Sequence, residues 1–283
     1  MKKLLAIAVT AALTVPMTST VFAAQHGKVM GQSTKAYGSI RYLLGLDGDK
    51  ALGDYGSRIG LKGSNGIDNG LSMTHKIELG IDPSGHKVNS VVNRSSYIGI
   101  KGGFGEVRFG SDWSPLDNLG DGADVLQNGN FGKVDGDINR SIKYLGKFGS
   151  VGVLASVIPK GNQVNTKSQL AAIYSAGPLY AGVGFGSNVG ENTNMVTLAY
   201  KGANYKVGLS TADDGSDDRA NSLMGKYSFG KAWVAAQFDK QGDAKAKHVD
   251  IGYKLGKGTK TFLQWKKADG QDATKAIGLR HDF

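Results

Sequence analysis

The side chains that could do chemistry in this sequence are mainly charged, and their arrangement favours an electrostatic role over catalysis. The five histidines are scattered without the spacing of metal ligands, and no nucleophile-elbow, phosphate-loop or zinc-protease motif is complete. His248 and Asp250 come nearest to a hydrolase pair, but two residues apart on one strand face they are expected to form an ordinary polar pair. We therefore expect no enzymatic activity, no cofactor and no metal site.

An acidic run at residues 213–218 raises the alternative of a divalent-cation site, because hard cations prefer carboxylate ligands. The run lacks the ordered ligand register of a calcium-binding loop, so a solvated loop is the favoured interpretation. The chain contains no cysteine, which excludes disulfide bonds, a thiolate nucleophile and cysteine-ligated metals.

Two opposed sets of charges give the strongest functional signal. The acidic set lies in the longest connection, 113–138, which carries a single base; its members are Asp117, Asp121, Asp124, Asp135 and Asp137. The basic set falls mainly on one face of the strands that precede this connection; its members are Arg41, Arg58, Lys62, Lys76, Arg94 and Arg108. An acidic loop facing a basic wall across a narrow water path would create a transverse field that guides ions of opposite sign along separate sides.

The elements that must position these charges are β-strands, because apolar and polar residues alternate along nearly the whole chain. Residues 71–81 show the pattern, with five apolar side chains opposite four polar ones. We count sixteen such segments, which begin near residues 34, 57, 70, 92, 104, 139, 150, 168, 178, 193, 204, 219, 231, 247, 259 and 273. Seven short, mostly Gly-rich turns alternate with eight longer polar loops, and this asymmetry predicts an all-β, sixteen-stranded antiparallel transmembrane barrel with both termini on the turn side.

Composition supports an exported β-protein. Glycine accounts for 43 of 283 residues without a collagen-like period, and the net charge of +10 is spread over strands, so nucleic-acid binding is not expected. A soluble sandwich would place denser Leu, Ile and Phe on one face. Here the apolar face is thin, and we expect it to carry Gly and Ala toward lipid, with Tyr and Trp near the strand ends.

The first 23 residues have the features of a secretory signal peptide. Two lysines precede an apolar run of 12 residues, Leu4–Val15, and a small-residue cleavage site ends at Ala23. The apolar run is too short to span a bilayer as a helix, and no later stretch is long enough. The expected division is therefore a signal peptide at 1–23 and a barrel at 24–283.

Several blocks in order resemble the signature strands of the Gram-negative general porins of the neisserial and proteobacterial type. The blocks are Ser57–Ser64, Asn69–Leu71, Asn93–Ile100, Gly102–Gly110, Asn139–Tyr144 and Gly278–Phe283. The resemblance covers the whole chain after the signal segment. It implies a sixteen-stranded barrel in the outer membrane, usually a homotrimer, whose third long loop folds into the lumen and narrows it. One departure is Ser111, which stands where many relatives carry an arginine after the glycine that ends the fifth strand.

The resemblance also implies partners. The terminal strand, with Phe283 at its end, resembles the signature read by the outer-membrane assembly machinery. Lipid and lipopolysaccharide phosphates are the expected surroundings of the outer face. The expected function is passive diffusion of small hydrophilic solutes and ions through a water-filled channel with a weak preference for anions. The alternative is an outer-membrane or secreted all-β adhesin or binding protein without pore activity.

Two points remain open at the level of sequence. Arg94 and Arg108 could act on permeating ions, or could pair with Glu78, Glu106 or the loop aspartates and hold the loop down. The inward parity of Arg94 also turns Ile98 and Ile100 inward, unless a β-bulge intervenes or these side chains pack beneath the loop.

Overall fold

The computed structural model describes residues 33–48, 51–85, 91–129, 136–159, 167–188, 191–213, 215 and 218–283. The predicted signal segment lies outside these residues. The strands are β1 (Ser33–Gly45), β2 (Leu52–Asp54), β3 (Arg58–Gly66), β4 (Ser72–Ile81), β5 (Val91–Gly102), β6 (Gly105–Trp113), β7 (Asp137–Phe148), β8 (Val151–Ile158), β9 (Lys167–Ala176), β10 (Leu179–Asn188), β11 (Glu191–Lys201), β12 (Tyr205–Asp213), β13 (Ala220–Phe229), β14 (Ala232–Gln241), β15 (Ala244–Gly256), β16 (Thr259–Ala268) and β17 (Thr274–Asp282).

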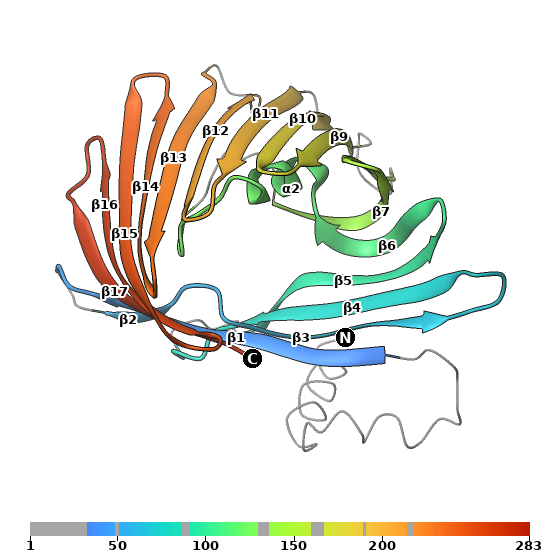
Figure 1. Ribbon diagram of the computed structural model, residues 1–283, viewed down its shortest axis with the longest axis horizontal. Helices are drawn as coiled ribbons and strands as arrows, with labels where there is room; N and C mark the ends of the chain where they lie inside the picture. The colour runs from blue at the N-terminus through green and yellow to red at the C-terminus, as the bar shows by residue number, and fades with distance from the viewer. Residues whose placement is uncertain are drawn as a thin grey trace.

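The strands form one closed antiparallel sheet (Figure 1). From β3 onward each strand pairs with the next along the chain, and β1 pairs with β17 to close the ring. The short strand β2 and strand β3 both pair with β1, so together they occupy one position in the wall. The barrel therefore has sixteen strand positions, as the alternation predicts.

The break between β2 and β3 has a local cause. The Asp54 carboxylate accepts hydrogen bonds from the backbone N–H groups of Gly56 and Ser57, both at 2.9 Å. Gly56 adopts a φ of 108°, a conformation that side chains with a Cβ rarely take. The resulting turn interrupts the ladder for three residues without opening the barrel.

The chain end seals the barrel. Phe283 donates its N–H to the Gly38 carbonyl at 3.1 Å, and Gly38 donates its N–H to the Phe283 carbonyl at 3.0 Å. The Phe283 ring stands over Gly38, where a Cβ would come within 2.3 Å of the ring. The last residue therefore extends the β1–β17 seam, and only a glycine leaves room for its ring.

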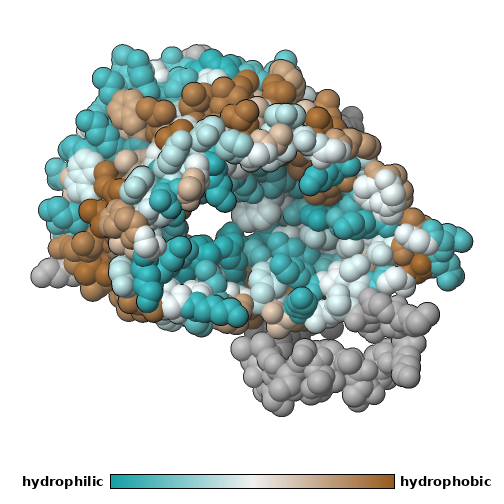
Figure 2. Space-filling view, viewed as in Figure 1, coloured by the Kyte–Doolittle hydropathy of each residue, from teal (hydrophilic) through white to brown (hydrophobic). Residues whose placement is uncertain are grey.

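The two faces of the sheet differ in chemistry. Large apolar side chains such as Ile77, Phe185 and Leu223 are more than half exposed on the outside, whereas neighbouring positions such as Glu78 and Asp250 are buried inside. Figure 2 shows hydrophilic residues around an opening through the molecule and hydrophobic ones toward its outer side. This is the arrangement of a sheet with lipid outside and water inside.

Two expectations about the faces hold only in part. Exposed tyrosines do lie near the strand ends, at Tyr200, Tyr205, Tyr227 and Tyr253, but some glycines and one tryptophan face inward. The glycines of β10, Gly182, Gly184 and Gly186, lie on the inner face, where their missing side chains admit leucines from the longest connection. Trp233 is also inside, with 2% of its surface exposed, and does not lie in an interfacial girdle. Sequence parity alone could not separate a small residue facing lipid from a small residue facing a packed loop.

The connections agree with the predicted asymmetry except at two places. The longer loop expected at 188–192 is reduced to two connecting residues, because Asn188 of β10 pairs with Glu191 of β11. Residues 240–246 were expected to form a longer loop, but β14 and β15 extend until only Gly242 and Asp243 join them. Gly242 has a φ of 56°, which suits a tight turn. In the described part of the chain, no helix is long and apolar enough to cross a membrane.

The longest connection contains a helix that the alternation did not predict. Helix α2 runs from Pro115 to Asp121, and the Ser114 side chain caps it by accepting the Asp117 N–H at 3.0 Å. A serine followed by a proline at the first helical position is a known start signal, so the helix was readable from the sequence.

Candidate functional site in the barrel lumen

Helix α2 lies against the inner face of the sheet, beside β9 and β10 (Figure 1). Leu116 and Leu119 are fully buried there, in a cluster with Leu154, Ala171 and Met195. A Cβ added at Gly184 would come within 2.4 Å of the Leu116 side chain and 2.8 Å of Leu119. The inner face of β10, with Gly182, Gly184 and Gly186, is thus the surface on which α2 packs, and we call it the seat of the helix.

After α2 the chain continues over a second apolar cluster, which adjoins the first along the inner wall. Ala123, Val125 and Leu126 pack there with Trp233 of β14 and Phe262 of β16. The centroids of the two aromatic rings are 6.5 Å apart. Burial of these apolar groups is the main force that can hold the segment against the wall, at about 25 cal/mol per Å² of surface removed from water.

Hydrogen bonds fix the end of this segment. The Gln127 N–H donates to the Asp250 carboxylate at 2.9 Å, and the Lys266 ammonium donates to the Asn128 carbonyl at 2.7 Å. Asp250 is fully buried and also lies 2.9 Å from the His248 ring. The His248–Asp250 pair is therefore a polar pair in the lumen that also holds the loop backbone.

The Glu78 carboxylate forms ion pairs with three of the predicted wall bases. Arg58, Lys76 and Arg94 place nitrogen atoms 3.7, 3.3 and 3.2 Å from the Glu78 carboxylate. Tyr37 donates its hydroxyl to the same carboxylate at 2.7 Å. Three positive charges around one negative charge leave an excess of positive charge on this part of the wall.

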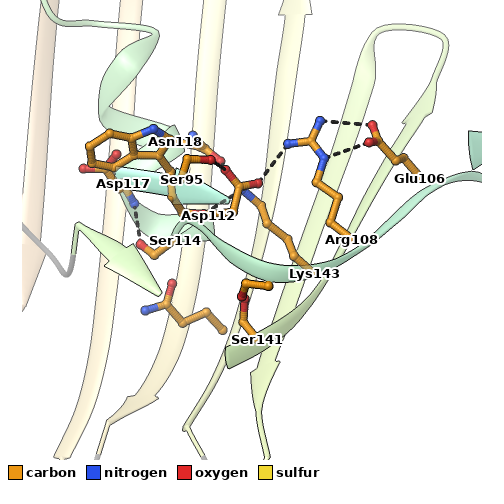
Figure 3. Close-up of polar contacts among 12 residues, drawn as sticks. Ser95, Glu106, Arg108, Asp112, Ser114, Asp117, Asn118, Ser141 and Lys143 are labelled. Atoms are coloured by element: carbon orange, nitrogen blue, oxygen red, sulfur yellow. Dashed lines mark hydrogen bonds and ion pairs between the residues drawn. The ribbon is translucent and has the colours of Figure 1, made fainter. Parts of the chain in front are cut away.

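Arg108 belongs to a second, neighbouring network (Figure 3). Its guanidinium binds both oxygens of Glu106, at 2.9 and 3.0 Å, and lies 2.8 Å from the Asp112 carboxylate. It also stands over the Tyr97 ring, 4.3 Å from the centroid. Such a bidentate pair fixes the guanidinium in one orientation.

Lys143 completes this network beneath the loop. Its ammonium lies 3.4 Å from the Asp112 carboxylate and donates to the Trp113 carbonyl and the Asn118 side chain, both at 2.7 Å (Figure 3). Only 1% of its surface is exposed. Lys143 lies directly opposite Arg108 in the ladder and so faces inward, but its burial removes it from the water path.

The remaining wall bases are not part of these networks. Arg41 donates to the Ser39 hydroxyl at 2.8 Å and stands over the Tyr55 ring, and Lys62 stands over the Tyr37 ring at 4.9 Å. The structure thus brings together Arg58, Lys76 and Arg94, and places Arg108 beside them on β6.

A bulge explains how Arg94 faces inward. Glu78 pairs with Ser95 and Leu79 pairs with Asn93, so Arg94 is the extra residue on β5. Ile98 is 52% exposed on the outside. Of the alternatives left open by the sequence, the β-bulge is the one that the structure contains.

A second irregularity lies at the departure from the family pattern. Gly110 pairs with Ser141 and Asp112 pairs with Ile138, so the register shifts at Ser111. Ser111 itself lies opposite Ser96 in the ladder. Its neighbour Asp112 is the residue that enters the lumen network beside Arg108.

The loop aspartates lie apart from these bases. Asp117 is in the first turn of α2, Asp121 ends the helix, and Asp124 follows it. Among the described residues, no ion pair within 4 Å joins Asp121 or Asp124 to the basic wall. Asp137 begins β7, and Asp135 lies outside the described residues.

The surroundings of two loop carboxyls alter their ionisation. Partial desolvation by the nearby protein raises the pKa of Asp121 and of Asp124, even though both residues remain accessible to solvent. A bond from the Asn118 amide at 3.4 Å and the charge of Lys206 act in the opposite direction, more weakly. Both carboxyls therefore accept protons at a higher pH than an ordinary aspartate.

Sequence reasoning missed several participants. Asp112 could have been found, because it follows Arg108 by four residues and shares its parity. The glycine seat of α2 and the Trp233–Phe262 cluster gave no signal, because their partners come from a distant loop. The 213–218 run is only partly described; within the described chain, no three potential ligands converge as a metal site.

Comparison with known proteins fits this architecture. The sequence profile of the family described as Gram-negative porin matches residues 8–273. The major outer membrane protein P.IB of Neisseria gonorrhoeae is 31% identical over 153 residues, which is 51% of this chain and 43% of that protein. P.IB of Neisseria lactamica is 37% identical over 78 residues, or 28% of this chain and 23% of that protein. The aligned regions thus span less than half the length of these relatives.

Solved structures agree on the fold. A mutant porin of Rh. blastica has a TM-score of 0.75 at 18% identity, over 89% of this chain and 100% of that one. OmpT of Vibrio cholerae, described in a trimer form, has a TM-score of 0.72 at 19% identity, over 90% of this chain and 100% of that one. Together with the family match over most of its length, these observations show that the chain belongs to the Gram-negative porins, a family of outer-membrane β-barrels.

Proposed function

We propose that the chain forms a water-filled channel through which small hydrophilic solutes and ions diffuse passively. The observation that carries the proposal is the closed sheet with an apolar outer face and a charged inner face, in a member of the porin family. The channel needs no cofactor and no energy input. A non-conducting adhesin is the competing function, and it would not need two networks of buried charge inside its barrel.

The same proposal includes a constriction. The segment 113–138 would narrow the channel, with Asp117, Asp121, Asp124, Asp135 and Asp137 on its side. Arg41, Arg58, Lys62, Lys76, Arg94 and Arg108 would form the facing wall. The packing of α2 and of residues 123–126 on the inner face supports this assignment.

The excess of bases over acids on the wall supports a weak preference for anions. In physiological salt the Debye length is about 8 Å, so charges that line a narrow lumen lie close enough to a passing ion to act on it. The preference should therefore fade as the salt concentration rises.

Planar lipid bilayers test the channel directly. Purified protein should produce discrete, stepwise increases in conductance, each corresponding to one inserted unit. If the folded protein at saturating concentration produces no conductance, the proposed channel function is wrong and the adhesin is favoured.

Assembly is proposed on two grounds. A homotrimer is proposed from family resemblance, and the V. cholerae neighbour is described in a trimer form. Recognition by the outer-membrane assembly machinery is proposed for the strand that contains Phe283, which extends the β1–β17 seam. Lipid and lipopolysaccharide would surround the apolar outer face.

A further inference from the structure

A cavity of about 520 Å³ lies at the loop side of the lumen, between the wall and the long connection. Strands β16, β17, β1 and β2, which lie side by side in the sheet, form its wall (Figure 1). Asn128 of the long connection also lines it, and the Lys266 ammonium holds the Asn128 carbonyl at 2.7 Å. The cavity is therefore separate from the networks of Glu78 and Arg108, none of whose members line it.

The floor of this cavity is made of small residues. Gln264 of β16 pairs with Ala276 of β17, and Ala276 pairs with Gly45 of β1. Gly53 of β2 pairs with Leu43 on the next part of the floor. A Cβ added at Gly45 would have its nearest neighbour at 3.8 Å, and one added at Gly53 would meet no atom of the described chain within 4 Å. These two glycines thus border open space, unlike the glycines of β10, which are covered by leucines.

Two opposite charges stand on the two sides of this floor. Lys266 of β16 pairs directly with Thr274 of β17. The Leu46 N–H bonds the Lys275 carbonyl at 2.8 Å, so Asp47 comes level with Thr274 on its other side. Neighbouring strands are about 4.8 Å apart, which places the backbones of Asp47 and Lys266 about 10 Å from each other. The cavity therefore has a carboxylate on one side and an ammonium group on the other.

Both groups keep the capacity to bind an external partner. The Lys266 ammonium has three N–H donors, of which the Asn128 carbonyl takes one. The described residues offer Lys266 no carboxylate within 4 Å. Asp47 lies 3.8 Å from Lys275, and their side chains are 41% and 59% exposed, so this ion pair contributes little. The other acid of the cavity, Asp54, is engaged by two backbone N–H groups of the following turn.

We infer that this cavity binds a dipeptide with free termini. The terminal ammonium binds Asp47 and the terminal carboxylate binds Lys266. Two residues of extended chain span about 7 Å, which is of the order of the gap between these charges, whereas the two charges of a single amino acid are too close together to reach both sides. Leu43 and Tyr55, which also pack on the Trp233–Phe262 cluster, offer apolar surface to the side chains of the peptide.

Calorimetric titration with alanyl-leucine tests the inference on the whole purified protein in a non-ionic detergent. The unmodified protein should bind the dipeptide, and Asp47→Asn should bind it about tenfold more weakly, because a charged hydrogen bond is lost. Gly45→Leu fills the floor without a backbone clash and should bind no dipeptide at millimolar concentration. Equal affinity in either variant, or no binding by the unmodified protein at millimolar dipeptide, would overturn the site.

Two matched variants control for charge and for added volume. Asp243→Asn removes the same charge in the tight turn between β14 and β15, outside the cavity. Gly225 of β13 pairs with Val207, which is 47% exposed on the outside, so Gly225→Leu adds the same side chain toward lipid. Both variants should bind alanyl-leucine as the unmodified protein does. Loss of affinity in either one would show that the effect does not belong to the cavity and would overturn the site.

Two further arms test the ligand class and separate the two proposals. N-acetyl-alanyl-leucine amide lacks both terminal charges and should not bind at millimolar concentration; affinity equal to that of alanyl-leucine would overturn the assignment to charged termini. That dipeptides are solutes of the channel rests on the proposed function, but calorimetry does not require conduction. Dipeptide binding without conductance would overturn the channel alone, and stepwise conductance without dipeptide binding would overturn the site alone.

Discussion

The lumen has two basic walls, which differ in how far nearby carboxylates balance their positive charge. On β3–β7, five bases are tied to Glu78, Glu106 and Asp112 by ion pairs of 2.8–3.7 Å. On β11–β15, no carboxylate of a described residue lies within 4 Å of the ammonium groups of four lysines, Lys201, Lys206, Lys226 and Lys254. The first arrangement fixes side chains and cancels much of their charge. The second leaves the charge exposed to whatever enters the lumen, so structural and functional charge are divided between the two sides.

The largest effect should come from breaking the paired wall at its centre. Glu78→Gln leaves Arg58, Lys76 and Arg94 crowded without their shared anion, in a place where Glu78 is 4% exposed. We expect a loss of about 1.5–3 kcal/mol in unfolding free energy, the range for a lost hydrogen bond to a charged group. Urea unfolding in liposomes measures it.

The other wall provides the control for this prediction. Lys226→Gln removes a charge that has no close carboxylate and that faces a like-charged neighbour. Its unfolding free energy should be unchanged or slightly higher. Equal destabilisation by the two substitutions would contradict the division between paired and unpaired walls.

A somewhat smaller effect is expected from the loop that lies against the inner wall. Gly184→Leu would drive a side chain into Leu116 and Leu119, and overpacking of this kind costs about 1–3 kcal/mol. We expect α2 to leave its seat and the single-channel conductance to rise. Val183→Leu adds volume to the outer face of the same strand and should leave conductance unchanged.

Selectivity should respond more modestly to single charges. Neutralising Arg58, Lys76 or Arg108 should shift the reversal potential across a salt gradient toward cations, and Lys206→Gln should shift it further. The reason is that the lysine ammonium groups line an open cavity in the lumen, whereas Arg58, Lys76 and Arg108 are held against carboxylates of the wall. A clear cation preference in the unmodified channel would show that the loop aspartates dominate.

The smallest predicted effect is on pH dependence. The pKa values of Asp121 and Asp124 are raised by partial desolvation, so both carboxyls take up protons as the pH falls from neutrality, before ordinary aspartates do. The loop loses negative charge, and the anion preference should rise. Because the folded pKa exceeds the unfolded one, the ionised carboxyls destabilise the fold at neutral pH, and acidification relieves this.

A variant isolates the contribution of these two carboxyls. Asp121→Asn/Asp124→Asn should have a stronger anion preference at neutral pH and a smaller change in reversal potential on acidification. An unaltered pH profile in this variant would contradict the assignment of the pH dependence to these two carboxyls.

Much of the barrel was predictable because strand alternation is local. Each predicted strand start lies within three residues of the observed one, and the bulge at Arg94 was one of the two alternatives that the sequence left open for reconciling its parity with that of Ile98. The site was predictable only in part. Parity identifies which bases point inward, but ion pairing depends on side-chain reach between strands, and the seat of α2 depends on contacts between β10 and a loop more than fifty residues earlier.

The most direct test of the central claim compares two double variants in one reversal-potential experiment across a KCl gradient. Glu106→Gln/Arg108→Gln removes a pair whose charges cancel, so the reversal potential should stay at the unmodified value even if stability falls. Lys206→Gln/Lys226→Gln removes two charges without close partners, so the reversal potential should move clearly toward cations. The opposite result, a shift in the first variant and none in the second, would contradict the assignment of functional charge to the lysine wall.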